Sequence, residues 1–304
     1  MAVKKRKSKL RKPIQKRKAR LRARKRTPGA ARPAVRLPRT AKLPGTSTPA
    51  SARAFVSGVE LPRAKARRRD GPAEALTLQE MGFDTAKDQA ALVGSEIVSF
   101  VSGVTAERRE AITNAALLAQ LAATKAVPDE TNIDAWYRKY FETLKKVGWV
   151  LQDYEFKEYE EASQGFEAHQ AILEVAALFM GAAAPAAMLV LTTTLKALQS
   201  MGKDNPWITL FDRQSRVSTV ARFQVSIAEQ EPSGQFIVRT MAFVLSAKST
   251  ITQVLFFKAT ENQAKLRYHS GKVTVDAAVL EGVSAAIKAK LVAHARDFIH
   301  TLDL

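Results

Sequence analysis

The clearest pattern of hydrophobic and polar positions lies in the C-terminal third of the chain. Residues 217–227 alternate between apolar and polar side chains, which is typical of a strand with one buried face. The segments 236–247 and 251–257 are apolar on both faces and therefore predict central strands. Shorter apolar runs at 266–268 and 272–275 add one or two strands.

Turn-forming residues separate these strands. Pro232-Ser233-Gly234, Glu261-Asn262 and Gly271 stand between consecutive apolar segments. Strands joined by such short turns pair antiparallel, so we expect a sheet of four to five antiparallel strands within 207–275. Asp276 is a suitable N-cap for a helix over 277–302, whose apolar positions recur at helical spacing.

The segment 75–203 has the apolar spacing of helices. It predicts a helix over 76–93, a short apolar element at 97–101, and two longer helices at about 105–127 and 132–148. The aromatic stripe of the last helix is typical of a core-facing surface, although it would also suit a ligand-binding wall.

These elements together predict an α+β fold. The central strands are apolar on both faces, so one face must meet the helical half and the other the C-terminal helix. We expect a helical N-terminal half packed on a four- to five-stranded antiparallel sheet with a C-terminal helix, preceded by a long disordered basic tail. The predicted organisation is a tail over 1–70 and a single domain over 71–304.

The function depends on whether an uncharged stretch over 175–195 is buried in the protein or inserts into a membrane. This stretch holds roughly the 20 residues that a helix needs to cross a bilayer, but Gly181 and Pro185 interrupt it. A proline kinks a helix or begins one, which favours two short helices buried as a hairpin in a soluble core. The alternative is a hairpin over 172–196 that leaves the core and inserts into a membrane. The candidate membrane-inserting residues are Leu178, Phe179, Met188, Leu189, Val190 and Leu191.

The charge of the chain is concentrated at its N-terminus. The net charge is +19, from 48 Lys and Arg against 29 Asp and Glu. Residues 1–70 hold 25 of the basic residues and two acids, Glu60 and Asp70, which leaves 23 basic and 27 acidic residues in 71–304. A segment so basic and so poor in large apolar residues cannot bury a core, so we expect it to be disordered when free.

A flexible cationic tail binds polyanions and releases their counterions. DNA, RNA, anionic lipid and an acidic protein carrier are the candidate partners. Phe55 is the one aromatic residue in the tail, so we do not expect the tail to stack on nucleic-acid bases. The candidate polyanion-binding residues are Lys4, Lys5, Arg6, Lys7, Lys16, Arg17, Lys18, Arg20, Arg22, Arg24, Lys25, Arg26, Arg67, Arg68 and Arg69.

The tail also bears on localisation. Its basic clusters fit nuclear or nucleoid targeting, or export by a non-Sec route. No apolar segment follows the N-terminal charges, so a Sec signal peptide is not expected and an intracellular location is predicted.

No catalytic or metal-binding motif is visible. The chain has no cysteine, and its four histidines have no metal-ligand spacing. The acidic residues at 153–161 form a cluster that is typical of a solvated face, and an enzyme would need some of them to converge with His169. We therefore expect no metal, no cofactor and no enzymatic activity.

Two functions remain. The first is a non-enzymatic binding or structural protein, whose cationic tail docks to a polyanion while the α+β domain binds a partner. The second is a membrane-active effector or toxin-like protein, in which the apolar hairpin inserts and the tail serves as an address or packaging signal.

Overall fold

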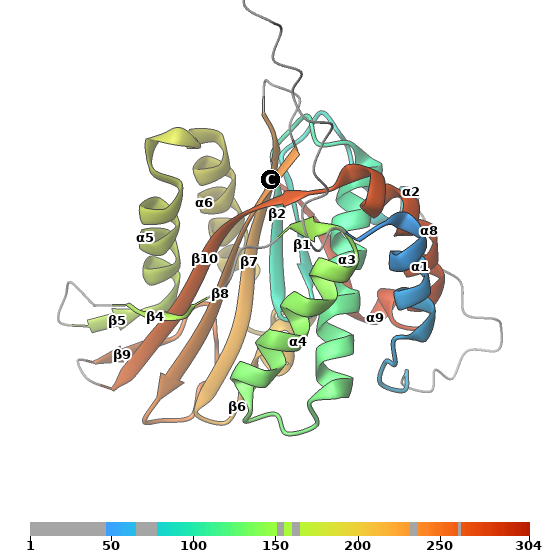
Figure 1. The fold of residues 1–304 in the computed structure, drawn as a ribbon. Coiled ribbons are helices and arrows are strands. Elements are labelled where there is room, and N and C mark those ends of the chain that lie inside the picture. The colour runs from blue at the N-terminus through green and yellow to red at the C-terminus, as the bar shows by residue number, and fades with distance from the viewer. Residues whose placement is uncertain (1–46, 65–77, 151–154, 160–164, 232–235, 261–262) are drawn as a thin grey trace, which may run out of the picture. The chain divides into compact units, whose positions relative to one another are not determined.

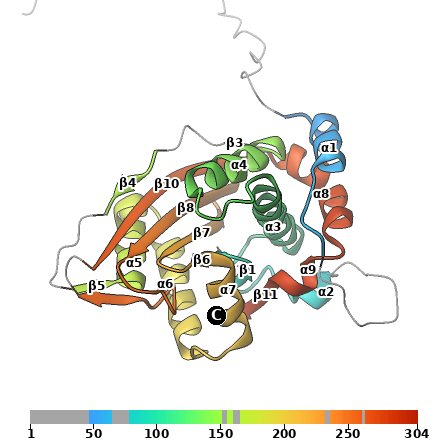
Figure 2. The same cartoon turned by 90° about the horizontal axis from the view of Figure 1, so that it is seen from below.

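A large twisted sheet lies between two layers of helices in the computed structural model, which describes residues 47–64, 78–150, 155–159, 165–231, 236–260 and 263–304 (Figure 1). All described residues belong to one unit, Leu43–Leu304. Its layers confirm the predicted α+β class, with helices on both faces of the sheet (Figure 2).

The main sheet has nine strands, in the order β11-β1-β2-β7-β8-β10-β3, with β4 beside β10 and β6 beside β7. All neighbours pair antiparallel except β2 and β7, which are parallel. The sheet therefore has more strands than the predicted four to five. The bounds are β1 Gln89–Val93, β2 Glu96–Phe100, β3 Trp149–Val150, β4 Lys157–Glu158, β6 Arg216–Val217, β7 Val220–Gln230, β8 Phe236–Ala247, β10 Ala264–Val275 and β11 Ile299–Asp303.

One face of the sheet is covered by α3 (Ala106–Ala126), α4 (Ile133–Lys146), α8 (Ala277–Leu291) and α1 (Pro49–Gly58). The C-terminal helix was expected on the opposite face from the helical half, and this is wrong: α8 packs beside α3 on the same face. Helix α3 begins where the sequence predicted, because Thr105 accepts a hydrogen bond from the backbone N–H of Arg108. The apolar side chains of this layer meet the alternating residues of β7 and β8 that face them, among them Ala228 and Val244.

The other face is covered by α5 (Ala168–Met180), the single 3₁₀ turn η1 (Gly181–Ala183), α6 (Pro185–Ser200) and α7 (Pro206–Ser215). Phe223, Val225 and Phe243 point from the sheet into this second core. Strand β8 is thus buried on both faces, as the two-sided apolar pattern of 236–247 indicated. The expectation of one buried face for 217–227 is wrong, because the polar side chains of β7 are buried as well: Gln224 and Arg222 contact α4. A separate two-stranded sheet, β5 (Gly165–Glu167) with β9 (Lys258–Thr260), lies at the start of α5.

The predicted helix over 76–93 is wrong. In the described part of this segment, residues 78–93, the helix is confined to α2 (Leu78–Met81), and Gln89–Val93 forms strand β1. All five residues of β1 are buried between β2 and β11. Pairing on both sides satisfies the backbone of this alanine-rich segment, so tertiary contacts override its helical propensity.

The predicted strand over 251–257 is also wrong. Ile251, Val254 and Leu255 are buried, but the segment is irregular up to β9. Its backbone groups pair elsewhere: Asp212 accepts the Val254 N–H at 2.8 Å, and the Ile251 N–H donates to the Ser218 carbonyl. An apolar loop therefore fills the second core without joining the sheet.

The C-terminal segments differ from prediction in two ways. Residues 264–275 form one continuous strand rather than two, because every residue from Ala264 to Thr274 pairs with β8. The expected helix over 277–302 ends at Leu291, and α9 (Ala295–Phe298) leads into β11, which pairs with β1. Strand β11 supplies the partner that β1 would otherwise lack at the sheet edge.

Ordered structure begins before residue 71. Residues 47–64, assigned above to a disordered tail, include helix α1, which packs on α8. Thr48 and Ser51 form a capping box, and Ala52 and Val56 are buried. A Cβ on Gly282 would meet the ring of Pro49 at 3.0 Å, so glycine permits this close helix packing.

Candidate functional site

The predicted polyanion-binding residues lie outside the described residues. This applies to the cluster from Lys4 to Arg26 and to Arg67, Arg68 and Arg69. Their role stays a prediction.

The candidate membrane-inserting residues lie on two antiparallel helices that stand against one face of the sheet (Figure 1). Helix α5 ends at Met180, and Gly181 follows with a φ of 56°, a conformation that favours glycine. Pro185 opens α6, where the missing N–H is not needed. The break between Gly181 and Pro185 is thus where the sequence placed it.

The six candidate residues divide between two faces of this α5–α6 hairpin. Leu178 is 76% exposed and Leu189 is 64% exposed. Phe179 and Met188 are half-buried at the boundary, whereas Val190 and Leu191 are buried. Leu178 and Leu189 are therefore available to a membrane or partner without any rearrangement.

The surface around the hairpin turn carries no charge. Between Glu174 and Lys196 every residue is uncharged. The exposed residues beside the two leucines are small and apolar: Ala177, Gly181, Ala182, Ala183, Pro185 and Ala186. An exposed apolar surface of this kind marks a contact with another apolar phase more often than a solvated face.

The threonines of α6 add little polarity to the hairpin. Thr192, Thr193 and Thr194 each donate their hydroxyl to the carbonyl four residues earlier, at 2.8, 3.0 and 2.8 Å. Such bonds within the helix lower the cost of moving a hydroxyl into an apolar phase.

The inner face of the hairpin packs on the sheet through apolar side chains. Ile172, Val175 and Leu191 are fully buried against the sheet. A buried side-chain hydrogen bond also joins the two layers, since the hydroxyls of Ser99 on β2 and Thr194 on α6 lie 2.9 Å apart. The hairpin is therefore attached mainly by non-directional apolar contacts. No helix in the described part of the chain has both the length and the apolar content to cross a bilayer.

The residues considered for catalysis do not converge. Glu155 and Glu158 are exposed, and Glu158 pairs with Lys265 at 3.3 Å. His169 instead faces Glu167, with Nε2 and the carboxylate 3.7 Å apart. Among the described residues, no group of three or more acids and histidines is placed to hold a metal ion.

One carboxyl group is fully buried in the interface between sheet and helices. Glu96 on β2 accepts hydrogen bonds from the hydroxyls of Tyr140 and Ser226, both at 2.7 Å. Burial raises the pKa of Glu96 to about 7, against the opposing effect of these hydrogen bonds. With no exposed surface, Glu96 can act on the stability of the fold but has no access to a substrate.

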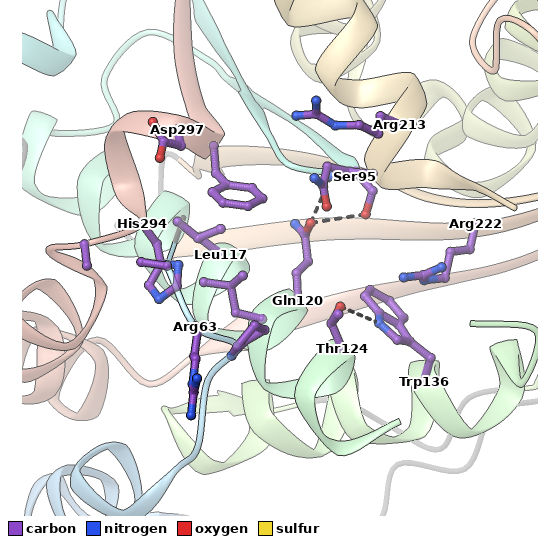
Figure 3. A pocket seen from close by; sticks show the side chains of 16 residues that line it. Arg63, Ser95, Leu117, Gln120, Thr124, Trp136, Arg213, Arg222, His294 and Asp297 are labelled. Atoms are coloured by element: carbon purple, nitrogen blue, oxygen red, sulfur yellow. Dashed lines mark hydrogen bonds between the residues drawn. The ribbon is translucent and has the colours of Figure 1, made fainter. Parts of the chain in front are cut away.

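A pocket of about 230 Å³ lies beyond this network, between α3, α7 and the segment around α9 (Figure 3). Arg213 and Arg222 reach it from α7 and β7, and His294 and Asp297 lie across from them. We call it the arginine pocket. Its lining residues are Pro62, Arg63, Ala64, Ser95, Leu117, Gln120, Leu121, Thr124, Trp136, Arg213, Gln214, Arg222, Ala293, His294, Asp297 and Phe298.

No pattern in the sequence indicated the arginine pocket. Its polar residues come from segments as far apart as Ser95 and Asp297, without a local motif. One signal was available: Arg222 is the one charged residue in the alternating segment 217–227, where a buried charge needs a partner.

Comparison with known proteins leaves the family of this chain open. No protein-family model and no curated protein matches it. Three solved structures show a distant likeness. A delta-endotoxin is 14% identical, covering 73% of this chain and 97% of its own, with a TM-score of 0.37.

The Evf virulence factor is 9% identical, over 66% of this chain and 82% of its own, with a TM-score of 0.33. The activated Cyt2Ba monomer from Bacillus thuringiensis subsp. israelensis is 16% identical, over 60% of this chain and 97% of its own, also with a TM-score of 0.33. Likenesses this weak carry no argument about what this chain does.

Proposed function

We propose that this protein is membrane-active, and that the turn of the α5–α6 hairpin docks on an anionic lipid bilayer. The observation that carries the proposal is the exposure of Leu178 and Leu189 beside an uncharged turn. Burying each leucine in lipid contributes roughly 1.5–3 kcal/mol. Two such anchors on one rigid turn give a defined docking surface.

The basic N-terminal segment supports the same function. Clusters such as Lys4–Lys7 and Lys16–Arg26 attract an anionic membrane by about 1 kcal/mol for each Lys or Arg near its surface. That attraction is sequence-independent and weakens with salt, whereas leucine insertion does not. The two contributions are therefore separable by experiment.

Insertion would follow docking by release of the hairpin from the sheet. Between Glu174 and Lys196 the hairpin carries no charge on either face, so this part of a released hairpin can be buried in lipid. Helix α5, with 13 residues, is about 20 Å long, which is short of the roughly 30 Å hydrocarbon core. The expected depth is accordingly the interface or one leaflet.

Co-sedimentation with vesicles tests docking. The full chain is compared with Leu178→Asp, Leu189→Asp and the double variant, on neutral and anionic vesicles at low and high salt. Because both leucines are exposed, the variants should fold. Val150→Asp on β3 is the matched control, since Val150 is the other large apolar side chain strongly exposed in the described residues, at 42%.

The expected result is that the leucine variants lose the salt-resistant part of binding and Val150→Asp keeps it. Unchanged vesicle binding in the double variant would contradict the docking surface. If the full chain pellets equally with duplex DNA and salt releases it from both, the tail is a general polyanion ligand and the hairpin is not involved.

A reversible crosslink tests hairpin release. The hydroxyls of Ser99 and Thr194 face each other at 2.9 Å, and the chain has no other cysteine to interfere, so Ser99→Cys with Thr194→Cys should form a disulfide. The oxidised variant should still dock but cause no dye leakage from anionic vesicles, and reduction should restore leakage. Equal leakage before and after reduction would show that release is not required.

A further inference from the structure

We propose that the arginine pocket binds a small organic anion, with its carboxylate or phosphate held by Arg222 and Arg213 and its apolar body against Trp136. This inference does not depend on the membrane activity proposed above. None of the residues that line the pocket belongs to the α5–α6 hairpin: they come from α3, α4, α7, β7 and the segments around Arg63, Ser95 and α9.

The burial of Arg222 without a partner for its Nε is the observation on which the proposal depends. Its side chain comes from β7 and is 7% exposed, yet its Nε has no hydrogen-bond partner among the described residues. The guanidinium lies over the ring of Trp136, 4.3 Å from the centroid, and is directed toward the middle of the pocket (Figure 3). A cation–π contact offsets only part of the cost of burying a guanidinium, so its donors favour an acceptor with negative charge.

The charges around the pocket are unbalanced in favour of an anion. Arg63, Arg213 and Arg222 line it against one carboxylate, Asp297. Glu130 also acts on Arg222 electrostatically, but it is exposed at the end of the α3–α4 loop and does not line the pocket. Burial lowers the pKa of His294, which leaves the imidazole neutral at pH 7 and able to donate one hydrogen bond.

Four of the other polar groups that line the pocket, those of Ser95, Gln120, Thr124 and Trp136, are already engaged. The Gln120 carboxamide accepts from the Ser95 N–H at 2.9 Å and donates to the Val93 carbonyl at 2.8 Å. Trp136 donates its Nε1–H to the Thr124 hydroxyl at 3.1 Å. The arginines are therefore the charged donors that remain to recognise a ligand, with the His294 imidazole as a further donor.

The apolar lining sets the rest of the ligand class. Leu117, Leu121 and Phe298 complete a wall with Trp136, and the volume of about 230 Å³ is small for a binding cavity, which typically spans about 300–1,000 Å³. An aryl or short-chain body fits this space, whereas a nucleotide or a two-chain phospholipid is too large. Benzoate and phenyl phosphate are suitable probes, and inorganic phosphate tests the anionic group alone.

Titration of the full chain with these probes tests the proposal, by calorimetry and by tryptophan fluorescence. Arg213→Gln is the main variant, because Arg213 is exposed and its loss should leave the fold intact. Arg222→Met removes the buried charge and keeps most of the side-chain volume. Arg267→Gln, on β10 and outside the pocket, is the matched control.

Phenyl phosphate or benzoate should bind saturably, and inorganic phosphate more weakly. Arg213→Gln and Arg222→Met should each weaken binding roughly 10- to 100-fold, the equivalent of losing a charge-assisted hydrogen bond, while Arg267→Gln should not. Leu178→Asp should bind as the full chain does, which separates this site from membrane docking.

Three results would overturn the proposal. They are the absence of saturable binding at millimolar probe, equal affinity in Arg213→Gln and the unmodified chain, and equal affinity for inorganic phosphate and phenyl phosphate. Equal affinity in Arg213→Gln would indicate that the anion binds to the basic N-terminal segment. Equal affinity for the two phosphates would show that the apolar wall does not contribute to binding. Should Arg222→Met fail to fold, the exposed Arg213→Gln still decides.

Discussion

The hydroxyl of Tyr140 on α4 donates a 2.7 Å hydrogen bond to Glu96 Oε2 on β2, and neither side chain has any exposed surface. Ser226 on the neighbouring strand β7 donates to the other oxygen of the same carboxyl group. An acid in this position ties helix α4 to the point where β2 and β7 pair in parallel. Its protonation state must therefore affect the stability of the whole sheet.

We predict that the contribution of Glu96 to the free energy of unfolding falls as pH rises from about 4.5 to about 7. Below this range Glu96 is protonated in both folded and unfolded chains, and above it both are ionised. Between the two values the unfolded chain loses its proton first, so folding loses about 3 kcal/mol across the window. Urea unfolding at several pH values measures this.

Glu96→Gln isolates the contribution of this one group. Asp212, whose pKa burial raises to about 6, adds a fall of the same sign but is unchanged by the substitution. Between acid and neutral pH, the free energy of unfolding of Glu96→Gln should rise by about 3 kcal/mol relative to that of the unmodified chain. A pH-independent difference would mean that Glu96 titrates normally.

We predict opposite outcomes for two leucines of α6 that are two positions apart. Leu191 is fully buried against the sheet, so Leu191→Ala should cost roughly 2–5 kcal/mol through lost burial and a cavity. Leu189 is 64% exposed, and Leu189→Ala should change stability by less than about 0.5 kcal/mol. Chemical denaturation measures both, and similar losses would show that the outer face of the hairpin is covered in solution.

We predict that Gly94→Ala is more destabilising than Gly82→Ala. Both glycines have positive φ, 57° and 65°, which alone costs an alanine about 1 kcal/mol. A Cβ on Gly94 would also lie 2.5 Å from Gln120 Oε1, whereas nothing lies within 4 Å of one on Gly82. Displacing the Gln120 carboxamide should add about 1–3 kcal/mol, because it bonds to Ser95 inside the core.

Thermal unfolding of the two glycine variants measures the difference. Gln120→Ala combined with Gly94→Ala provides the control, since it relieves the clash. If the clash is the cause, the two substitutions should be less than additive. Equal losses for Gly94→Ala and Gly82→Ala would leave backbone conformation as the whole effect.

We predict that a chain beginning at residue 47 is more stable than one beginning at residue 71. The shorter chain lacks α1, whose Ala52 and Val56 are buried and whose Arg53 donates to the Gly282 carbonyl at 2.9 Å. The loss should be at least about 2 kcal/mol from apolar burial alone. Denaturant unfolding of the two truncated chains measures it.

A pair of point variants checks the same contact in the full chain. Val56→Asp should destabilise by placing a charge against α8, and Ser57→Asp on the exposed side of α1 should not. Equal stability of the two truncated chains, together with a neutral Val56→Asp, would show that α1 does not contribute to the fold.

The amino-acid sequence by itself determined the α+β class, the strands over 217–227 and 236–247, and the break in the hairpin. Each of these depends on a local signal. Residues 217–227 alternate because successive side chains of a strand point to opposite faces of the sheet, Thr105 and Asn132 cap the helices that follow them, and Pro185 is tolerated in the first turn of a helix. Apolar residues on both faces of 236–247 already required two covering layers.

Only the tertiary structure decided what depends on distant partners. Gln89–Val93 is a strand because β2 and β11 flank it, and 251–257 is a loop because Asp212 and Ser218 take its backbone bonds. The sequence placed Leu178, Leu189 and Leu191 in one apolar stretch. Only the structure shows that Leu178 and Leu189 are exposed whereas Leu191 is buried against the sheet. The arginine pocket has no local pattern, since packing of α3, β7 and α9 brings its residues together, and side-chain contact across the chain is a property of the fold.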